Sequence, residues 1–360
     1  MEIYIFDRQL NLQGILGSYF SFRWVRKYSK CGDFELHCAL TPESVKLLKK
    51  GNVIWKNNDL EAGYIEYRKI SLNTKGDEIL VVKGKFLTGY ISRRIIWGIE
   101  NYNTASELAI RDLIDKNCIN PIDVDRVVDL LELEAVKGFT QTVNTQTSYA
   151  NVLDKVESIA NTSELGIRTL IDLENKKMLF DIYEGLDRTA SQSINPPAIF
   201  SQEFENILSQ EYTESESNYK NVVLIAGEGE GIERELATVG QGIGLDRFEL
   251  FVDARDLQKE EMTTEQYIEK LEGRGSSRLA ESVEIQNFDS KINLNSNLTY
   301  KEDFDLGDQV TCTSKRWGVT IDTKITEIEE VYEGSGFSVN VVFGDNMPTI
   351  IDKIKQVVRQ

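Results

Sequence analysis

The sequence predicts a mainly β, α+β chain in which two β-barrel-like modules flank a small α/β insert. Apolar residues alternate at period two in the first hundred residues and again after residue 220, which is typical of half-buried strands. Between these regions they recur at helical spacing. A chain of 360 residues also exceeds the ~100 to 200 of one domain. We expect a first module at 1–100, the insert at 101–200, a second module at 201–345 and a C-terminal surface helix at 346–360.

The first module is predicted from three short alternating runs and one hairpin. The runs place apolar side chains on one face at Ile3 and Ile5, then at Phe20, Phe22 and Trp24, then at Phe34, Leu36 and Cys38. Thr41 has the position of a helix cap, with Pro42 in the first turn. Strands at 64–72 and 78–84 are joined by a turn at 73–77 whose residues accept positive φ.

The insert is predicted to hold two helices and a hairpin. Thr104 and Glu107 have the spacing of a capping box, so a helix is expected from Asn103 to about Lys116. The stretch 122–135 is compatible with either strand or helix. A second helix, capped by Thr147 or Ser148, carries an apolar stripe at Val152, Val156, Ile159 and Ala160. Strands at 166–173 and 177–183 form a hairpin.

The second module is predicted to begin with a three-stranded meander at 221–226, 232–238 and 247–253. Thr263 and Gln266 cap a helix that Gly273-Arg274-Gly275 interrupts and that resumes at 276–282. A strand at 283–285 and closing strands around 308–312, 319–321 and 339–343 complete the module.

Composition and charge exclude several classes of protein. Residues 1–100 carry 16 Lys and Arg against 11 Asp and Glu, whereas the whole chain has a net charge of −18. The remainder is therefore strongly acidic, which disfavours wrapping by nucleic acid and suits charge-complementary contacts between copies or partners. We find no signal peptide and no apolar run long enough for a membrane span, and we expect a soluble chain.

The few cysteines and the single histidine limit the available chemistry. Cys31, Cys38, Cys118 and Cys312 lack the paired spacing of a zinc site, and we interpret them as reduced and structural. His37 falls beside Glu35 on the face of a strand opposite its apolar residues, which is typical of a surface histidine.

A glycine-rich loop after a predicted strand raises the question of phosphate binding. Gly227, Gly229 and Gly231 follow an apolar run, but their spacing is G-x-G-x-G, and Glu228 and Glu230 between them would repel a phosphate. We interpret the loop as a turn or bulge, and the stretch from Gly185 to Gly231 as the joint that carries the chain into the second module.

Acidic residues near this loop suggest a second chemistry, a glycoside hydrolase with two carboxyls about 5 to 9.5 Å apart. The candidates are Glu228, Glu230, Glu233, Glu235, Asp253 and Asp256. In a chain with 59 acidic residues, such a group is also typical of a solvated face. The spacing of a calcium-binding loop is missing.

Two further patterns are interpreted as structural. Asp187-Arg188-Thr189 is expected to form a local charge pair or a side-chain-to-backbone turn. Basic residues alternate with aromatic ones in the segments 23–28 and 93–97, a pattern that also occurs where bases stack on protein. Their strand-like alternation favours core and rim positions.

Six segments, in order along nearly the whole chain, resemble the tail hub family of long-tailed bacteriophages. This family is similar to the baseplate hub and to the N-terminal part of tail-associated lysin proteins. The segments are Tyr28–Leu36, Phe86–Arg94, Gly185–Thr189, Phe200–Asn206, Tyr219–Gly231 and Phe343–Thr349.

The resemblance implies a tail-hub-like fold and a structural function. It implies a homotrimeric ring at the tail tip of a phage, prophage or tail-like particle, in which two barrel-like domains per subunit give pseudo-sixfold symmetry. The implied partners are the tail tube or distal-tail ring above and a fibre, spike or tape-measure protein at the tip. DNA would pass through an acidic lumen without specific binding, with no membrane anchor, and assembly would take place in the host cytoplasm.

Many relatives continue into a peptidoglycan-degrading or fibre domain, whereas this sequence ends soon after Pro348, so we expect no enzymatic activity. The sequence assigns no catalytic, cofactor-binding or metal-ligating residue. Two other functions stay open, a cell-wall glycoside hydrolase that uses the acidic residues and a module that binds a host surface glycan.

Overall fold

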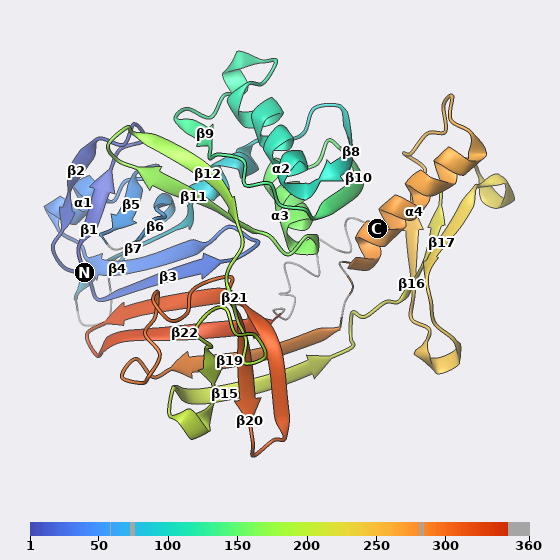
Figure 1. Cartoon of the computed structure of the whole chain (residues 1–360). Helices are drawn as coiled ribbons and strands as arrows, with labels where there is room; N and C mark the ends of the chain where they lie inside the picture. The colour runs from blue at the N-terminus through green and yellow to red at the C-terminus, as the bar shows by residue number, and fades with distance from the viewer. Residues whose placement is uncertain (58, 73–75, 281, 283, 345–360) are drawn as a thin grey trace.

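The computed structural model describes residues 1–57, 59–72, 76–280, 282 and 284–344. It is mainly β, as predicted, and one 14-stranded sheet runs through both ends of the chain. Figure 1 shows the N-terminal half of this sheet in blue beside the C-terminal half in red, with the green insert above them and a yellow and orange lobe at the side. None of the helices in these ranges is long and apolar enough to span a membrane.

The N-terminal half is a curled sheet with its core inside. Its order is β3-β4-β7-β6-β5-β1-β2, and helix α1 (Pro42–Leu47) is capped by Thr41 as predicted. Trp24 and Phe34 from neighbouring strands pack with Phe86 in one buried cluster that β1 also enters. The strands are β1 (Ile3–Phe6), β2 (Leu12–Leu16), β3 (Ser21–Lys27), β4 (Asp33–Ala39), β5 (Val53–Lys56), β6 (Gly63–Leu72) and β7 (Glu78–Phe86).

This half is barrel-like without closing into a barrel. Among the described residues, β2 pairs only with β1, and β3 continues into the other half through β21. Phe22 and Trp24 are buried as their alternation predicts, whereas Phe20 precedes β3 and is exposed.

The C-terminal half is built around the long strand β21 (Val319–Glu333), of which the sequence predicted only a short strand around 319–321. Phe200, Phe288, Phe304 and Phe343 fill its core. The other strands are β13 (Asp187–Arg188), β14 (Ile199–Phe200), β15 (Ile207–Ser215), β19 (Ile285–Ile292), β20 (Gln309–Ser314) and β22 (Gly336–Gly344). The strand expected at 283–285 has the wrong bounds, because β19 begins at Ile285 and runs to Ile292. Residue 283 and the helix expected at 346–360 lie outside the described residues.

The insert packs two helices against small sheets. The helices are α2 (Ser106–Ile114), continued by one π turn (Asp115–Ile119), and α3 (Val152–Thr162). A 3-10 segment (Leu87–Arg93) leads into the insert. The strands are the antiparallel pair β8 (Ile99–Ala105) and β10 (Thr142–Ser148), then β9 (Leu131–Leu133), β11 (Gly166–Asp172) and β12 (Lys177–Tyr183), of which the last two form the predicted hairpin.

Both predicted helix caps in the insert are wrong. Thr104 lies in β8, and Glu107 accepts hydrogen bonds from the backbone amides of residues 137–139 instead of closing a capping box. The cap of α3 is Asn151, whose side chain accepts from the amides of Leu153 and Asp154, because Thr147 and Ser148 belong to β10.

Residues 216–280 form a separate lobe between β15 and β19. Since Ser215 and Ile285 are paired partners in these two strands, the lobe extends from the end of a hairpin. It contains β16 (Val222–Ala226), β17 (Leu236–Gly240), β18 (Glu249–Asp253) and α4 (Thr264–Ala280). The predicted meander is wrong because β18 pairs parallel to β16, on the side opposite β17.

Helix α4 is continuous, which corrects the predicted interruption at Gly273-Arg274-Gly275. A Cβ on Gly275 would lie 2.5 Å from Cδ1 of Ile225, so this glycine permits close packing of the helix on the sheet. The capping box of Thr263 and Gln266 is confirmed by reciprocal hydrogen bonds to their backbone amides.

The stretch 185–231 enters the C-terminal half as predicted, because β13 and β14 pair with β20. Its glycine-rich end, however, connects β16 to β17 inside the lobe. Gly229 has a φ of +108°, and a Cβ there would meet the carbonyl oxygen of Glu233 at 3.0 Å.

We predict that Gly229→Val destabilises the chain by about 1 to 3 kcal/mol, because a β-branched residue is strained at positive φ. Chemical unfolding of the full chain measures the change. Gly17→Val is the matched control, since a Cβ at Gly17 has no atom within 4 Å and its φ lies outside the positive range. Equal stability of the two variants would contradict the prediction.

Candidate functional site

The two halves of the sheet are joined edge to edge by β3 and β21. These strands pair antiparallel from Glu327 opposite Lys27 to Glu333 opposite Ser21. Partners in this ladder are about 300 residues apart in the chain. The junction between the two halves therefore forms only when the two ends of the chain have come together.

A set of charges lies at this junction, and we call it the junction cluster; most of its members are buried, whereas Lys301 and Asp305 are partly exposed. It combines residues of the N-terminal half with residues of the C-terminal half. Its members are Arg26 on β3, Lys56, Asp59 and Glu61 near β5, Lys301 and Asp305 before β20, and Glu330 on β21.

Lys56 connects the halves directly. Its Nζ lies 2.7 Å from Oδ2 of Asp59 and 2.8 Å from Oε2 of Glu330, and its side chain has no solvent exposure. Lys301 Nζ lies 3.3 Å from the same Asp59 oxygen. The phenol of Tyr300 donates to Oε1 of Glu330 at 2.9 Å, so the carboxylate is held from several sides.

Arg26 forms the second connection. Its Nη1 lies 2.6 Å from Oδ1 of Asp305 in the C-terminal half, and its Nε lies 3.4 Å from Oε2 of Glu61 in the N-terminal half. The same Nη1 is 3.2 Å from the phenol oxygen of Tyr300. Since buried charges are tolerated only when paired, these contacts fix how the halves meet.

The cluster contains four carboxyl groups and three cations, and its carboxyls differ in pKa. Burial opposes the charge of Asp59, but Arg26, Lys56 and Lys301 hold its pKa well below the usual range. Burial raises the pKa of Glu61 to about 7, against the opposing effect of Arg26 and with a further contribution from Asp59. A neutral Glu61 leaves three carboxylates for three cations.

The acidic residues considered for glycoside hydrolysis are not arranged as an acid and a base. Hydrogen bonds from Arg255 and Arg234 lower the pKa of Asp253, and those from Arg274 lower the pKa of Asp256. A glycosidase needs one carboxyl whose pKa is raised. The structure therefore gives these two residues the role of ion-pair partners.

The other members of this acidic group also have structural contacts or face solvent. Glu235 pairs with Nζ of Lys259 at 3.3 Å, and Oε2 of Glu228 accepts from the amide of Lys259 at 2.9 Å. Glu230 and Glu233 lie on the exposed loop between β16 and β17.

The glycine-rich loop uses its amides within the lobe. Gly227 N–H donates to the carbonyl of Glu235, and Glu228 N–H donates to the phenol oxygen of Tyr267 at 2.7 Å. That phenol in turn donates to the carbonyl of Leu257. Since these donors are engaged, the structure supports the interpretation of a turn over that of a phosphate loop.

The single histidine, the cysteines and the tryptophans of the basic and aromatic segments have the following surroundings. His37 Nε2 lies 2.7 Å from Glu35 and is partly exposed. The four cysteines are free, and burial raises the pKa of Cys118 to about 12. No group of three or more metal-ligating side chains occurs within the described ranges. Trp24 is a core residue, and Trp97 is half exposed beneath the guanidinium of Arg126.

The segment Asp187-Arg188-Thr189 forms the expected turn, with a different charge partner. The amide and hydroxyl of Thr189 both donate to Oδ1 of Asp187. Arg188 pairs with Asp308 across the sheet at 3.0 Å rather than with Asp187.

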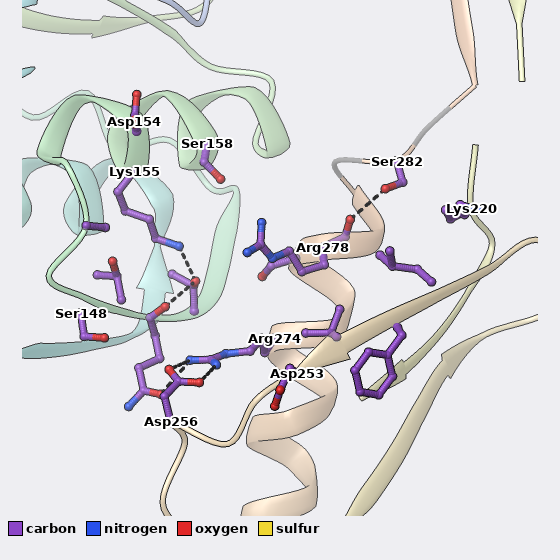
Figure 2. A pocket seen from close by; sticks show the side chains of 18 of the residues that line it. Ser148, Asp154, Lys155, Ser158, Lys220, Asp253, Asp256, Arg274, Arg278 and Ser282 are labelled. Atoms are coloured by element: carbon purple, nitrogen blue, oxygen red, sulfur yellow. Dashed lines mark hydrogen bonds and ion pairs between the residues drawn. The ribbon is translucent and has the colours of Figure 1, made fainter. Parts of the chain in front are cut away.

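Sequence reasoning missed a pocket between the insert and the lobe. It has a volume of about 470 Å³ and lies between α3 and β10 on one side and α4 and β18 on the other. In Figure 2, Lys155 projects from α3 and Arg278 from α4 into the space between the two helices. The lining comes from four distant parts of the chain, so no sequence motif announces it.

Hydrogen bonds organise the walls of this pocket. Nζ of Lys155 donates to the hydroxyl of Thr145 at 2.7 Å. Arg274 holds Asp256 through two nitrogens at 2.5 and 2.9 Å and reaches Oε1 of Gln146 at 3.5 Å, which links lobe and insert.

The chain was compared with known protein families and with curated proteins. The sequence profile of the siphovirus ReqiPepy6 Gp37-like proteins matches residues 2–345. No curated protein matches the chain in sequence.

Three solved structures share the fold across almost their whole length. A tail protein from Neisseria meningitidis MC58 is 11% identical, with a TM-score of 0.57 and 96% of each chain covered. The 43 kDa tail protein of prophage MuSo2 from Shewanella oneidensis is 12% identical, with a TM-score of 0.57 and coverage of 95% of this chain and 98% of that one. Prophage tail protein gp18 from Listeria monocytogenes EGD-e is 12% identical, with a TM-score of 0.55 and coverage of 100% and 99%.

We predict that Lys56→Met destabilises the chain by about 3 to 5 kcal/mol, because it leaves Asp59 and Glu330 with one buried cation fewer. Urea unfolding measures the loss. The control is Lys83→Met, which breaks a half-exposed pair with Glu35 and is expected to cost less than about 1 kcal/mol. Similar losses for both variants would show that the junction cluster does not hold the halves together.

The second prediction concerns pH. The pKa of Glu61 is 4.5 in the unfolded chain and about 7 in the folded chain. Folding therefore binds a proton between pH 4.5 and pH 7. The stabilisation from this group is complete below pH 4.5 and is lost as the pH rises through 7. Glu61→Gln should therefore flatten the decline in stability between pH 5 and 7.5.

Unfolding free energies of wild type and variant at several pH values across this interval provide the measurement. Glu43→Gln, a change at an exposed carboxyl, is the control and should keep the wild-type slope. A Glu61→Gln variant with the wild-type slope would refute the assignment.

Proposed function

Because the chain belongs to the family of siphovirus ReqiPepy6 Gp37-like proteins, we propose that it is the structural hub of a tail tip in a phage or phage-tail-like particle. In this proposal three copies form a ring with pseudo-sixfold symmetry. The ring joins the tail tube or distal-tail ring to the fibre, spike or tape-measure protein at the tip. The finished protein is part of the virion tail and is assembled in the bacterial cytoplasm.

The junction of two curled half-sheets within one chain is the observation that supports this function most. The two halves form one continuous sheet because β3 pairs with β21, and the ion pairs of the junction cluster connect residues of both halves. In this proposal a trimer of such chains presents six half-sheets to a partner ring with six subunits. Closed cyclic symmetry of this kind is usual for soluble oligomers.

The charge of the chain supports a passage for DNA through the ring. The net charge is −18, and all of the negative excess lies after residue 100, because residues 1–100 carry 16 Lys and Arg against 11 Asp and Glu. Like charge discourages DNA from adhering to the lumen, so the proposal includes passage without specific binding.

A structural role also agrees with the state of the acidic residues. Asp253 and Asp256 are held as ionised partners of arginines, which favours a structural function over hydrolysis of cell walls. Incubation with purified cell walls tests the hydrolytic alternative. Release of sugar or peptide fragments by the wild type, and its loss in Asp253→Asn or Asp256→Asn, would overturn this part of the proposal.

We predict that the purified chain forms a trimer, with a mass three times the 41.0 kDa of one chain. Light scattering coupled to size-exclusion chromatography measures this mass over a range of protein concentrations. An electron-microscopy image of the particle should show a ring with six similar lobes against the tube. A chain that stays monomeric at high concentration and fails to bind the tail-ring protein would contradict the proposal.

A further inference from the structure

Two groups of exposed apolar side chains lie on opposite attachments of the central sheet. Contiguous apolar areas on the surface of a protein usually mark contacts with other proteins. One group lies on the insert, and we call it the insert face. The other lies on the lobe, and we call it the lobe face.

The insert face combines side chains from two segments of the chain. They are Ile95, Trp97, Ile99 and Tyr149, and their exposed fractions range from 48% to 70%. The two segments are held together by backbone pairing, because Ile95 bridges to Asn151 and Ile99 pairs with Ser148. Tryptophan and tyrosine are enriched among the residues that contribute most to binding at protein interfaces.

Two arginines adjoin the insert face, and no carboxylate neutralises their charge. The guanidinium of Arg126 lies 4.1 Å from the centre of the Trp97 ring and donates to the carbonyl of Ile95. Arg94 donates to the carbonyl of Arg126. Among the described residues neither arginine forms an ion pair, not even with Asp125, the chain neighbour of Arg126. The insert face is therefore apolar and cationic.

The lobe face is the side of the three-stranded sheet that α4 does not cover. Helix α4 packs on Val223 and Ile225, so Leu224 between them points to the other side. Leu224 pairs with Phe251 on β18, and Leu236 on β17 has the same orientation. These three apolar side chains are between 41% and 56% exposed.

The loops at the ends of this sheet add exposed apolar side chains and carboxylates. Ile232 lies between Glu230 and Glu233 after β16, and Leu245 precedes Asp246 before β18. Within the described part of the chain, these three carboxylates form no ion pair. The lobe as a whole is acidic, because residues 216–280 carry 14 Asp and Glu against 8 Lys and Arg. The lobe face is therefore apolar and anionic.

The two faces do not meet within one chain. The lobe contacts the insert through α4, where Arg274 reaches Gln146 and the hydroxyl of Ser277 donates to the carbonyl of Asn144. The lobe face is on the opposite side of its sheet. An apolar face with unpaired cations and an apolar face with unpaired carboxylates are complementary in both respects, so each is a suitable cover for the other in a second copy.

We propose that the insert face of one copy binds the lobe face of the next copy. The apolar side chains of the two faces pack together, and Arg94 and Arg126 pair with carboxylates of the lobe loops. Each copy carries both faces, so this head-to-tail contact repeats, and a ring forms when the rotation between neighbours closes. The inference rests on the proposed trimer and names the contact that closes it.

Two double variants of the full chain test the faces separately. Trp97→Ala with Tyr149→Ala truncates the insert face, and Leu224→Ala with Leu236→Ala truncates the lobe face. Each should raise the concentration at which the trimer dissociates by at least about tenfold, because large apolar contacts are lost. The control is Tyr67→Ala with Ile194→Ala, which truncates two exposed side chains outside both faces and should leave self-association unchanged. Light scattering over a range of protein concentrations measures the mass.

A mixture of the two double variants tests the head-to-tail arrangement. The insert variant keeps an intact lobe face, and the lobe variant keeps an intact insert face. One intact contact is possible between them, so the mixture should form a complex of two chains that grows no further. This complex also shows that both variants are folded. Variants that lose self-association and do not combine with each other would refute the arrangement.

The mass of the wild type separates the inference from the proposed function. A trimeric wild type whose two double variants remain trimeric at the same concentrations would overturn the inference and leave the proposed trimer standing. A wild type that stays monomeric would overturn the trimer itself and this contact with it. If the double variants stay trimeric but no longer bind the tail-ring protein, the faces belong to that contact, and the inference is wrong.

Discussion

The pairing of β3 with β21 over the junction cluster determines how the two halves of the sheet meet. Neither strand is an edge in the finished sheet, and each would be one if the other half were missing. Lys56 is enclosed between Asp59 of its own half and Glu330 of the other. An incomplete set would leave a buried charge unpaired, which costs several kcal/mol. The two halves are therefore expected to be stable only together.

This constraint explains how the additional parts are arranged. The insert follows the last strand of the N-terminal half and packs above it, and the lobe extends from the hairpin of β15 and β19 at the far edge of the C-terminal half (Figure 1). Both are attached to a central sheet whose own geometry is fixed. The pocket lies where these two attachments meet, between α3 and β10 of the insert and α4 and β18 of the lobe.

Local patterns predicted much of the fold because they depend on near neighbours in the chain. Alternation placed Phe22 and Trp24 in the core, and capping residues located the start of α1 and of α4. Distant partnerships could not be predicted in this way. In the sequence, Arg26 and Glu330 have no feature that distinguishes them from exposed charges at the edge of a strand. Both are buried because β3 pairs with β21. Gly275 suggested a break in the helix when it was considered only with its neighbours in the chain. Its actual role is close packing on Ile225, and that residue lies on a strand 50 residues away.

Native-state hydrogen exchange of the full chain tests most directly whether the two halves form one cooperative unit. Amides of β4 in the N-terminal half and of β22 in the C-terminal half should exchange with the same free energy of opening. Lys56→Met should lower the free energy of opening of both strands by the same amount. If one half exchanges through an opening that leaves the other protected, the halves are independent domains that the β3–β21 junction does not couple.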